Sequence, residues 1–380
     1  MPEQRLRVSL ILPTYNRADL IGETLDAILA QTRPIDEILV MVDGSTDGTE
    51  DVLARYGDRI SVHVHENMGK AATMNRGLGL ATGDLIWICD DDDLLVPTAC
   101  ERLAGVLEAE PQTEFVAGQH KVFHVDPASG EKVFAKYLNW HPGGPGTIFP
   151  NMLDDCFILQ PALLSRRLCY DRVGGFDTAF IRSQDYEMNL RIARHCRGRL
   201  VDEVVYLYRK HEGPRGPSSA PIAASEIMAK WKIYNRKLFG ALVPDLADEE
   251  MLPDGALDGL TGEARERLLL IRRGGVYGRQ GMWPEALDLI CAAAARGAPT
   301  LSPAEAELLC RPLDSPFGFD DLVHDGLARG KIGQLIRTEP VGRQMWKTMR
   351  RHTRWRLKRA TLQGELSKAV TYGRFLAFPA

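Results

Sequence analysis

Four consecutive aspartates, Asp90–Asp93, are the residues of this chain whose types and spacing most clearly suggest chemistry. They follow Leu85–Cys89, a short and almost wholly apolar run of the kind that forms a strand covered on both faces. In an open α/β sheet, ligands bind at the carboxyl ends of the strands. Carboxylates gathered there repel one another, and a hard cation such as Mg²⁺ or Mn²⁺ with its own oxygen-rich ligand would relieve that repulsion. The alternative interpretation is a solvated acidic loop.

Three β-α units precede the aspartates and bring other polar residues to the same edge. The expected strands are Val8–Leu12, Glu37–Val42 and Ile60–His65, each followed by helical apolar spacing. Strands that alternate with helices at this spacing predict a parallel, doubly wound sheet, and right-handed crossovers place all the strand-end loops on one edge. The sequence therefore predicts that four sites converge: Asn16, Asp43, Lys70 and Asp90–Asp93.

The loop after the first strand excludes two common phosphate sites. Pro13–Arg17 contains no Gly-x-Gly-x-x-Gly, so it is not a dinucleotide-binding fingerprint, and the chain has no P-loop. A phosphate ligand must then be held by a metal ion and by side chains.

The second half of this region departs from strict alternation. Phe115–Val125 and Lys132–Tyr137 flank a turn and predict an antiparallel pair, and Leu200–Tyr208 predicts a last strand. The glycine- and proline-rich stretch His141–Gly146 is typical of a lid. Gly213–Ser219 has the composition of a linker, so we predict the main domain boundary there, with a first domain over residues 1–215.

Helices are predicted beyond the linker. Ala223–Leu242 is one, and Glu263–Tyr277 followed by Trp283–Arg296 predicts a helical hairpin similar to one tetratricopeptide-like pair, within a helical domain over 216–310. Residues 311–380 form a helical, basic tail that is rich in lysine and arginine from Arg343 onward, with Met345, Trp346, Met349, Trp355 and Leu357 interleaved. Such a segment either contacts an anionic membrane or is a solvated helix docked on its own domain.

The chain as a whole has no extreme composition. Its formal net charge is -4 over 380 residues, which indicates no particular partner. No apolar run of about 18 residues exists, and the first residues lack a signal-peptide core. We therefore expect a cytoplasmic protein, with peripheral contact at the inner face of the membrane if the basic tail binds there.

Several strings, taken in order, resemble the family 2 glycosyltransferases of GT-A fold over roughly the first 215 residues. They are Leu12–Arg17, Val42–Thr49, Asn67–Ala72, Ala81–Asp84, Asp90–Leu95, Val173–Asp177, Ser183–Tyr186 and Tyr208–Glu212. The resemblance implies a Rossmann-type mixed sheet followed by a smaller helical C-terminal domain. It also implies inverting transfer of a sugar from a nucleotide diphosphate, with a UDP-sugar favoured, to an acceptor hydroxyl. The product is expected in surface polysaccharide or glycoconjugate biosynthesis, with a glycan or lipid-linked acceptor and no nucleic acid partner.

The family's Asp-x-Asp motif falls on Asp90 and Asp92. By resemblance, Asp92 binds Mn²⁺ or Mg²⁺, while Asp90 and Asp91 reach the metal shell, the ribose or the donor sugar. His211 follows the last strand and is a candidate ligand of the metal or the diphosphate, with Arg209 adding positive charge. A structural role is the alternative for His211.

The resemblance also assigns residues to the nucleotide. The loop of Pro13, Thr14, Tyr15 and Asn16 would line it, Asp43 would contact the nucleoside, and Lys70 would lie near the base or a phosphate. Val42 departs from the family's usual Asp-Asp-Gly-Ser. The alternatives are a capping turn for Asp43, a surface charge for Lys70 and packing for Tyr15.

Asp185 matches the final acid of the family's Glu-Asp pair and is the candidate catalytic base. It opens a predicted helix over Tyr186–His195, whose dipole favours the ionised carboxylate. The alternative is an N-cap aspartate, and Gln184 stands where the family usually has glutamate. Two rival functions are a sugar-1-phosphate nucleotidyltransferase, which would need a glycine- and arginine-rich first loop, and a non-catalytic nucleotide-sugar-binding or scaffold protein.

Overall fold

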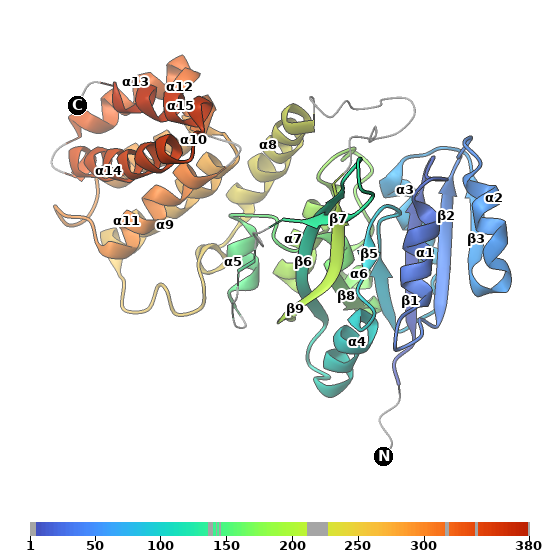
Figure 1. Ribbon diagram of the computed structural model, residues 1–380. Coiled ribbons are helices and arrows are strands. Elements are labelled where there is room, and N and C mark those ends of the chain that lie inside the picture. The colour runs from blue at the N-terminus through green and yellow to red at the C-terminus, as the bar shows by residue number, and fades with distance from the viewer. Residues whose placement is uncertain are drawn as a thin grey trace. The chain divides into compact units, whose positions relative to one another are not determined.

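The structure is a computed structural model that describes residues 5–135, 140–141, 143, 146–210, 227–315, 319–338 and 341–378. The chain divides into two compact units, Met1–Ile227 and Met228–Ala380, which are described separately (Figure 1). The predicted linker 213–219 and His211 lie outside the described residues, as does half of the predicted lid over 141–146. The predicted domain limits at 215 and 310 stay predictions.

The first unit begins with the predicted β-α units (Figure 1). In chain order these are β1 Val8–Thr14, α1 Ile21–Leu29, β2 Glu37–Asp43, α2 Thr49–Leu53, β3 Ser61–His65, α3 Lys70–Leu80 and β4 Leu85–Ile88. The four strands are parallel, in the order β3-β2-β1-β4. Helix α1 begins at Ile21 and not directly after β1, because Asn16 has a left-handed φ of 51° and Arg17–Leu20 forms a turn.

The remaining strands make the sheet mixed. These are β5 Leu94–Leu95, β6 Phe115–Val125, β7 Lys132–Phe134, β8 Leu163–Arg166 and β9 Gly198–Arg209. Strand β8 is antiparallel to β4 and β6, β9 is parallel to β6, and β5 is antiparallel to β9. Within the described residues the sheet has nine strands, and β7 pairs antiparallel with β6 as predicted. The mixed α/β fold class is confirmed.

Alternation along β1 sends side chains to two layers of helices. Leu10 and Leu12 belong to the core that holds Leu25 of α1 and Leu103 of α4, which spans Ala99–Ala109. Ile11 faces the other way, and a Cβ placed on Gly77 of α3 would lie 2.5 Å from its Cγ2. The sheet is therefore buried on both faces, as the continuous apolar strands predict.

Three helices of the first unit come between β7 and β9 in the chain. They are α5 Ile148–Met152, α6 Arg167–Val173 and α7 Gln184–His195. Helix α7 is fixed from several sides. The Tyr186 hydroxyl donates to the Met152 carbonyl at 2.5 Å, and the Asn189 side chain donates to the Ile158 carbonyl at 3.0 Å. These buried hydrogen bonds set the position of the helix N-terminus, which carries Asp185.

The second unit is helical throughout its described residues (Figure 1). Its α-helices are α8 Ile227–Asp245, α9 Gly262–Arg279, α10 Trp283–Ala294, α11 Pro303–Cys310, α12 Phe319–His324, α13 Gly326–Arg337, α14 Val341–Leu362 and α15 Leu366–Leu376. Helices α9 and α10 form the predicted hairpin, and α14 packs on α11, α13 and α15. Met345, Trp346 and Met349 are buried, so this face of α14 is docked on its own unit. None of the described helices has the length and hydropathy needed to cross a membrane.

Candidate active site

The acidic segment lies where expected, between the end of β4 and the start of β5. Asp90, Asp92 and Asp93 each offer one carboxylate oxygen, and these three oxygens lie within 4.8 Å of one another. An oxygen-only donor set of this kind suits a hard divalent cation. Asp93 was not among the predicted ligands, although it belongs to the same run of four.

Asp93 provides the fit test for a cation. Its carboxylate is buried, Oδ1 accepts a hydrogen bond from the Arg209 backbone N–H at 2.7 Å, and Oδ2 has no hydrogen-bond partner among the described residues. Burial and the charges of Asp92 and Asp90 raise the pKa of Asp93 well above its ordinary value. A cation among these carboxylates would complete the coordination of Oδ2 and offset the repulsion, so the residues fit Mg²⁺ or Mn²⁺.

Asp91 contacts the loop that follows β1. Its Oδ2 accepts from the Tyr15 N–H at 3.3 Å, and its Oδ1 lies 3.5 Å from the Arg17 guanidinium. Burial and the charge of Asp92 raise the pKa of Asp91 to about 7. Asp91 thus ties the acidic segment to the β1 loop, and its predicted contact with ribose or metal stays a prediction.

Arg209, the last residue of β9, binds the backbone of the acidic segment. Its Nε donates to the Asp92 carbonyl at 2.8 Å, its guanidinium pairs with Glu23 of α1, and the same group lies 4.8 Å from the centre of the Phe123 ring. Only 5% of Arg209 is exposed. The structure therefore shows a positioning role, and a direct contact with the donor stays a prediction.

Lys70 links the acidic segment to the candidate base. It is the first residue of α3, and its ammonium forms an ion pair with the Asp90 carboxylate. Burial would lower the pKa of Lys70, but the negative charges of Asp90, Asp185 and Asp92 raise it above its ordinary value. Because the charges of all three carboxylates act on one ammonium, Lys70 lies near both Asp185 and the acidic segment.

Asp185 lies in the first turn of α7, where its Oδ1 accepts a hydrogen bond from the Tyr186 N–H at 2.9 Å. Ser183, just before the helix, has a φ of 59°, and Asn16 has a φ of 51°. These are the only non-glycine residues with positive φ among those described; Asn16 is a predicted site residue, and Ser183 lies two positions before the candidate base. Strained backbone of this kind is concentrated at functional sites.

Asp43 organises the turn that leads into α3. Its Oδ1 accepts from the Met68 N–H at 2.7 Å and its Oδ2 from the Gly69 N–H at 3.0 Å. The structural alternative for Asp43 is therefore seen directly, since these bonds place Lys70 at the start of α3. Each carboxylate oxygen keeps a second lone pair, and the predicted nucleoside contact stays a prediction.

Hydrogen bonds link the loop that follows β1 to the loop that follows β2. The Asn16 side-chain oxygen accepts from the Thr46 N–H at 2.7 Å, and the Asn16 N–H donates to the Ser45 hydroxyl at 3.0 Å. Pro13 and Thr14 are the last two residues of β1. The structure thus brings together all the predicted site residues that it describes.

The acidic segment lies at the end of β4 in a mixed α/β sheet of GT-A-like fold. Residues 1–349 of S. aureus TarS have a similar structure, with a TM-score of 0.51 and 16% sequence identity, over 94% of this chain and 92% of that one. Residues 9–158 match the family model described as Glycosyl transferase family 2, the family that the sequence resembles.

Two curated proteins extend this comparison. An uncharacterized glycosyltransferase of Rickettsia typhi is 26% identical over 240 residues, which cover 61% of this chain and 72% of the relative. The glucosyl-dolichyl phosphate glucuronosyltransferase of Haloferax volcanii is 28% identical over 197 residues, which cover 50% of this chain and 62% of the relative. Both relatives carry the name of glycosyltransferases, in agreement with the family assignment.

Proposed function

We propose that this family 2 glycosyltransferase moves a sugar from a nucleotide-diphospho-sugar to an acceptor hydroxyl in one inverting displacement. The observation that carries the proposal is the group of carboxylates at the end of β4, where Lys70 forms an ion pair with Asp90 and lies near Asp185 as well. A single in-line displacement requires that the carboxylates that bind the donor and the carboxylate that deprotonates the acceptor lie around one reaction centre.

Asp185 serves as the general base. As the bond between the acceptor oxygen and the anomeric carbon forms, its carboxylate takes the hydroxyl proton, and the bond from the anomeric carbon to the diphosphate breaks. An inverting displacement of this kind needs no covalent enzyme intermediate.

Asp90, Asp92 and Asp93 would hold Mn²⁺ or Mg²⁺. When bound, the cation neutralises charge that develops on the diphosphate leaving group. Lys70 adds a fixed positive charge beside the same carboxylates. Arg209 and Asp91 keep the acidic segment in place against β9 and the β1 loop, so that the carboxylates are preorganised.

The loops after β1 and β2, with Pro13–Asn16 and Asp43, receive the nucleotide. We favour a UDP-sugar, because residues 1–349 of TarS, which share this fold, have been crystallised in complex with UDP-GlcNAc. We favour a glycan or lipid-linked acceptor in surface polysaccharide or glycoconjugate synthesis, since the Haloferax volcanii relative is named for a lipid-linked sugar acceptor. A cytoplasmic location is part of the same proposal.

A donor panel tests the proposal. Release of nucleoside diphosphate from UDP-, GDP- and dTDP-sugars is measured with Mn²⁺ for the wild type, Asp92→Ala and Asp185→Ala, with the exposed Asp51→Ala as a matched control. We expect turnover with one nucleotide class, loss in both site variants and full activity in the control. Equal turnover in all four proteins would overturn the mechanism. Release of pyrophosphate from a sugar-1-phosphate and a nucleoside triphosphate would favour the nucleotidyltransferase.

A further inference from the structure

A stripe of positive charge runs along the outer face of α14. Between residues 341 and 378 the chain has ten lysine and arginine residues and a single acid, Glu365. Four of the cations recur every three or four positions, so they lie on one face of the helix. This outer stripe consists of Lys347, Arg351, Arg354 and Lys358. All four are exposed, and none forms an ion pair with a carboxylate among the residues that the structure describes.

Two cations on the inner side of the same helix, in contrast, have partners within the chain. Arg356 pairs with Asp314, and Arg350 donates to the Leu376 carbonyl at 2.9 Å. The fold thus supplies partners where a cation packs against the unit. The outer stripe has none, and like charges four residues apart destabilise a helix. An arrangement that costs stability and contributes no packing indicates an anionic partner outside the chain.

Large apolar side chains lie beside the outer stripe. Trp355 is 58% exposed and Leu362 is 78% exposed, and both lie on the last turns of α14. Leu366 is 76% exposed and Val370 is 55% exposed, and both lie at the start of α15, directly after a short turn. We call these four exposed side chains, two on α14 and two on α15, the apolar cluster.

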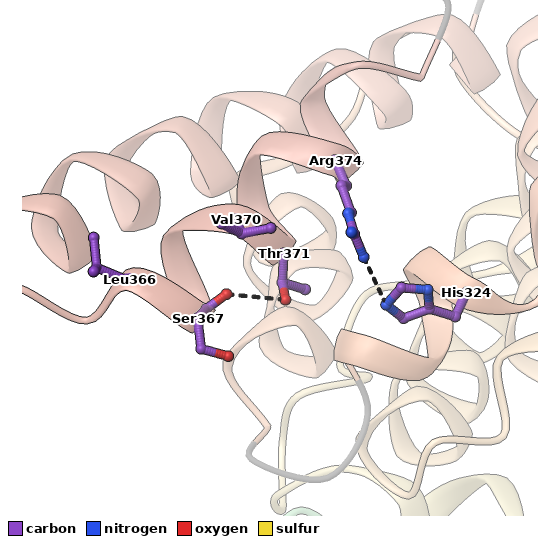
Figure 2. A pocket seen from close by; sticks show the side chains of 6 residues that line it. All are labelled: His324, Leu366, Ser367, Val370, Thr371 and Arg374. Atoms are coloured by element: carbon purple, nitrogen blue, oxygen red, sulfur yellow. Dashed lines mark hydrogen bonds between the residues drawn. The ribbon is translucent and has the colours of Figure 1, made fainter.

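The surface of α15 has a hollow that is lined by apolar and polar side chains together (Figure 2). Leu366 and Val370 line it together with the hydroxyl groups of Ser367 and Thr371. Arg374 points toward His324 across the hollow, with 3.4 Å between Nη1 and Nε2. This part of α15 therefore offers apolar, hydroxyl and cationic groups together.

We infer that the outer stripe and the apolar cluster bind the surface of a bilayer that contains anionic phospholipid. Basic residues are attracted to anionic headgroups, while tryptophan and leucine side chains enter the boundary between headgroups and acyl chains. An acidic protein or a nucleic acid would satisfy the stripe but would not account for four exposed apolar side chains beside it. Met345, Trp346 and Met349 take no part, because they are buried. The inference goes beyond the proposed function, since vesicle binding requires no sugar transfer.

Vesicle cosedimentation of the full chain tests this. The vesicles contain either phosphatidylcholine alone or equal parts of phosphatidylcholine and phosphatidylglycerol. We expect the wild type to bind only the anionic vesicles and to be released by high salt. Each cation at such a surface contributes about fivefold in affinity, so replacing all four stripe residues by alanine should weaken binding at least about 100-fold. Alanine also preserves helix propensity.

Two further variants complete the design. A charge-matched control removes four exposed cations at scattered positions: Arg55→Ala, Arg76→Ala, Lys230→Ala and Arg329→Ala. It should bind as the wild type does, while Trp355→Ser with Leu362→Ser should weaken binding with the charges intact. Failure of the wild type to bind anionic vesicles, or equal loss in the stripe variant and the control, would overturn the inference. Binding of an acidic polymer such as heparin with no vesicle binding would also overturn it.

Discussion

The two units each bury charge, and they do so in opposite ways. In the second unit Arg267 and Glu305 are both 3% exposed and form two hydrogen bonds of 2.6 and 2.8 Å with each other. The remaining guanidinium donors reach the carbonyl oxygens of Arg296, Ala298 and Thr300. In the first unit the acidic segment gathers carboxylates and leaves Asp93 Oδ2 without a partner among the described residues.

The difference separates charges that serve the fold from charges kept for a ligand. A buried pair with every donor and acceptor satisfied is balanced within the protein. In the acidic segment four carboxylates outnumber Lys70 and Arg17, the cations that pair with them among the described residues, and such an unbalanced cluster is unfavourable until something from outside neutralises it.

The largest expected effect is catalytic. Asp185→Asn should lower kcat by a factor of about 10²–10⁴, because asparagine cannot accept the acceptor proton. Asparagine keeps a side-chain oxygen that can accept the Tyr186 N–H, so the melting temperature and UDP affinity should stay unchanged. Steady-state kinetics with calorimetric UDP binding measure this. A variant with near wild-type kcat and a lowered melting temperature would make Asp185 a structural cap.

Breaking the balanced pair should destabilise the second unit. Glu305→Ala leaves the Arg267 guanidinium buried without its carboxylate, and we expect a loss of about 3–5 kcal/mol in the free energy of unfolding. Urea unfolding followed by far-UV circular dichroism measures the loss. The exposed partner pair of Arg311 and Glu307 is the control, and Glu307→Ala should cost less than about 1 kcal/mol. Equal losses in the two variants would remove the contrast between buried and exposed charge.

The stability that the ion pair of Arg267 and Glu305 contributes should decrease at low pH. Burial acts to raise the pKa of Glu305, but hydrogen bonds and the charge of Arg267 outweigh it, so the pKa is lowered from its ordinary value of 4.5. A lowered folded-state pKa gives stability that is fully present above the ordinary value and is lost as pH falls through the folded value. Unfolding free energies between about pH 6 and about pH 3 should therefore fall less steeply in Glu305→Gln than in the wild type. Parallel pH profiles would contradict this.

The smallest effect should come from the unbalanced cluster, and it has the opposite sign. Asp93→Asn keeps the acceptor for the Arg209 N–H and removes one like charge, so the metal-free protein should gain about 1 kcal/mol in unfolding free energy. The same change should weaken Mn²⁺ binding. Thermal unfolding with and without Mn²⁺ measures both. A destabilised metal-free variant would show that the cluster is already balanced.

Much of this picture follows from the sequence, and the missing parts have physical reasons. Strands β1, β2 and β4 are nearly continuous apolar runs and alternate with helical patterns, so their existence and parallel arrangement could be predicted. Strand β5 has two residues and β8 has four, which is too short for any periodicity. Their pairing with β9 and β4 makes the sheet mixed.

The roles of Asp90, Asp92 and Asp185 were assigned from the family resemblance and stay predictions. The convergence of the strand-end loops was predictable, because parallel strands separated by helices bring their carboxyl ends to one edge. The positioning role of Arg209 was not predictable, because its bond to the Asp92 carbonyl spans 117 positions and depends on the pairing of β9 with β5. The unpartnered oxygen of Asp93 was also missed, since burial of one carboxylate within a run of four leaves no mark in the sequence.

Cation binding tests the central claim most directly. Mn²⁺ is titrated with UDP present, and free Mn²⁺ is read by electron paramagnetic resonance for the wild type, Asp92→Asn and the exposed control Asp51→Asn. We predict one bound Mn²⁺ in the wild type and the control, with affinity at least about tenfold weaker in Asp92→Asn. Identical Mn²⁺ binding by all three proteins would contradict a cation site at the end of β4.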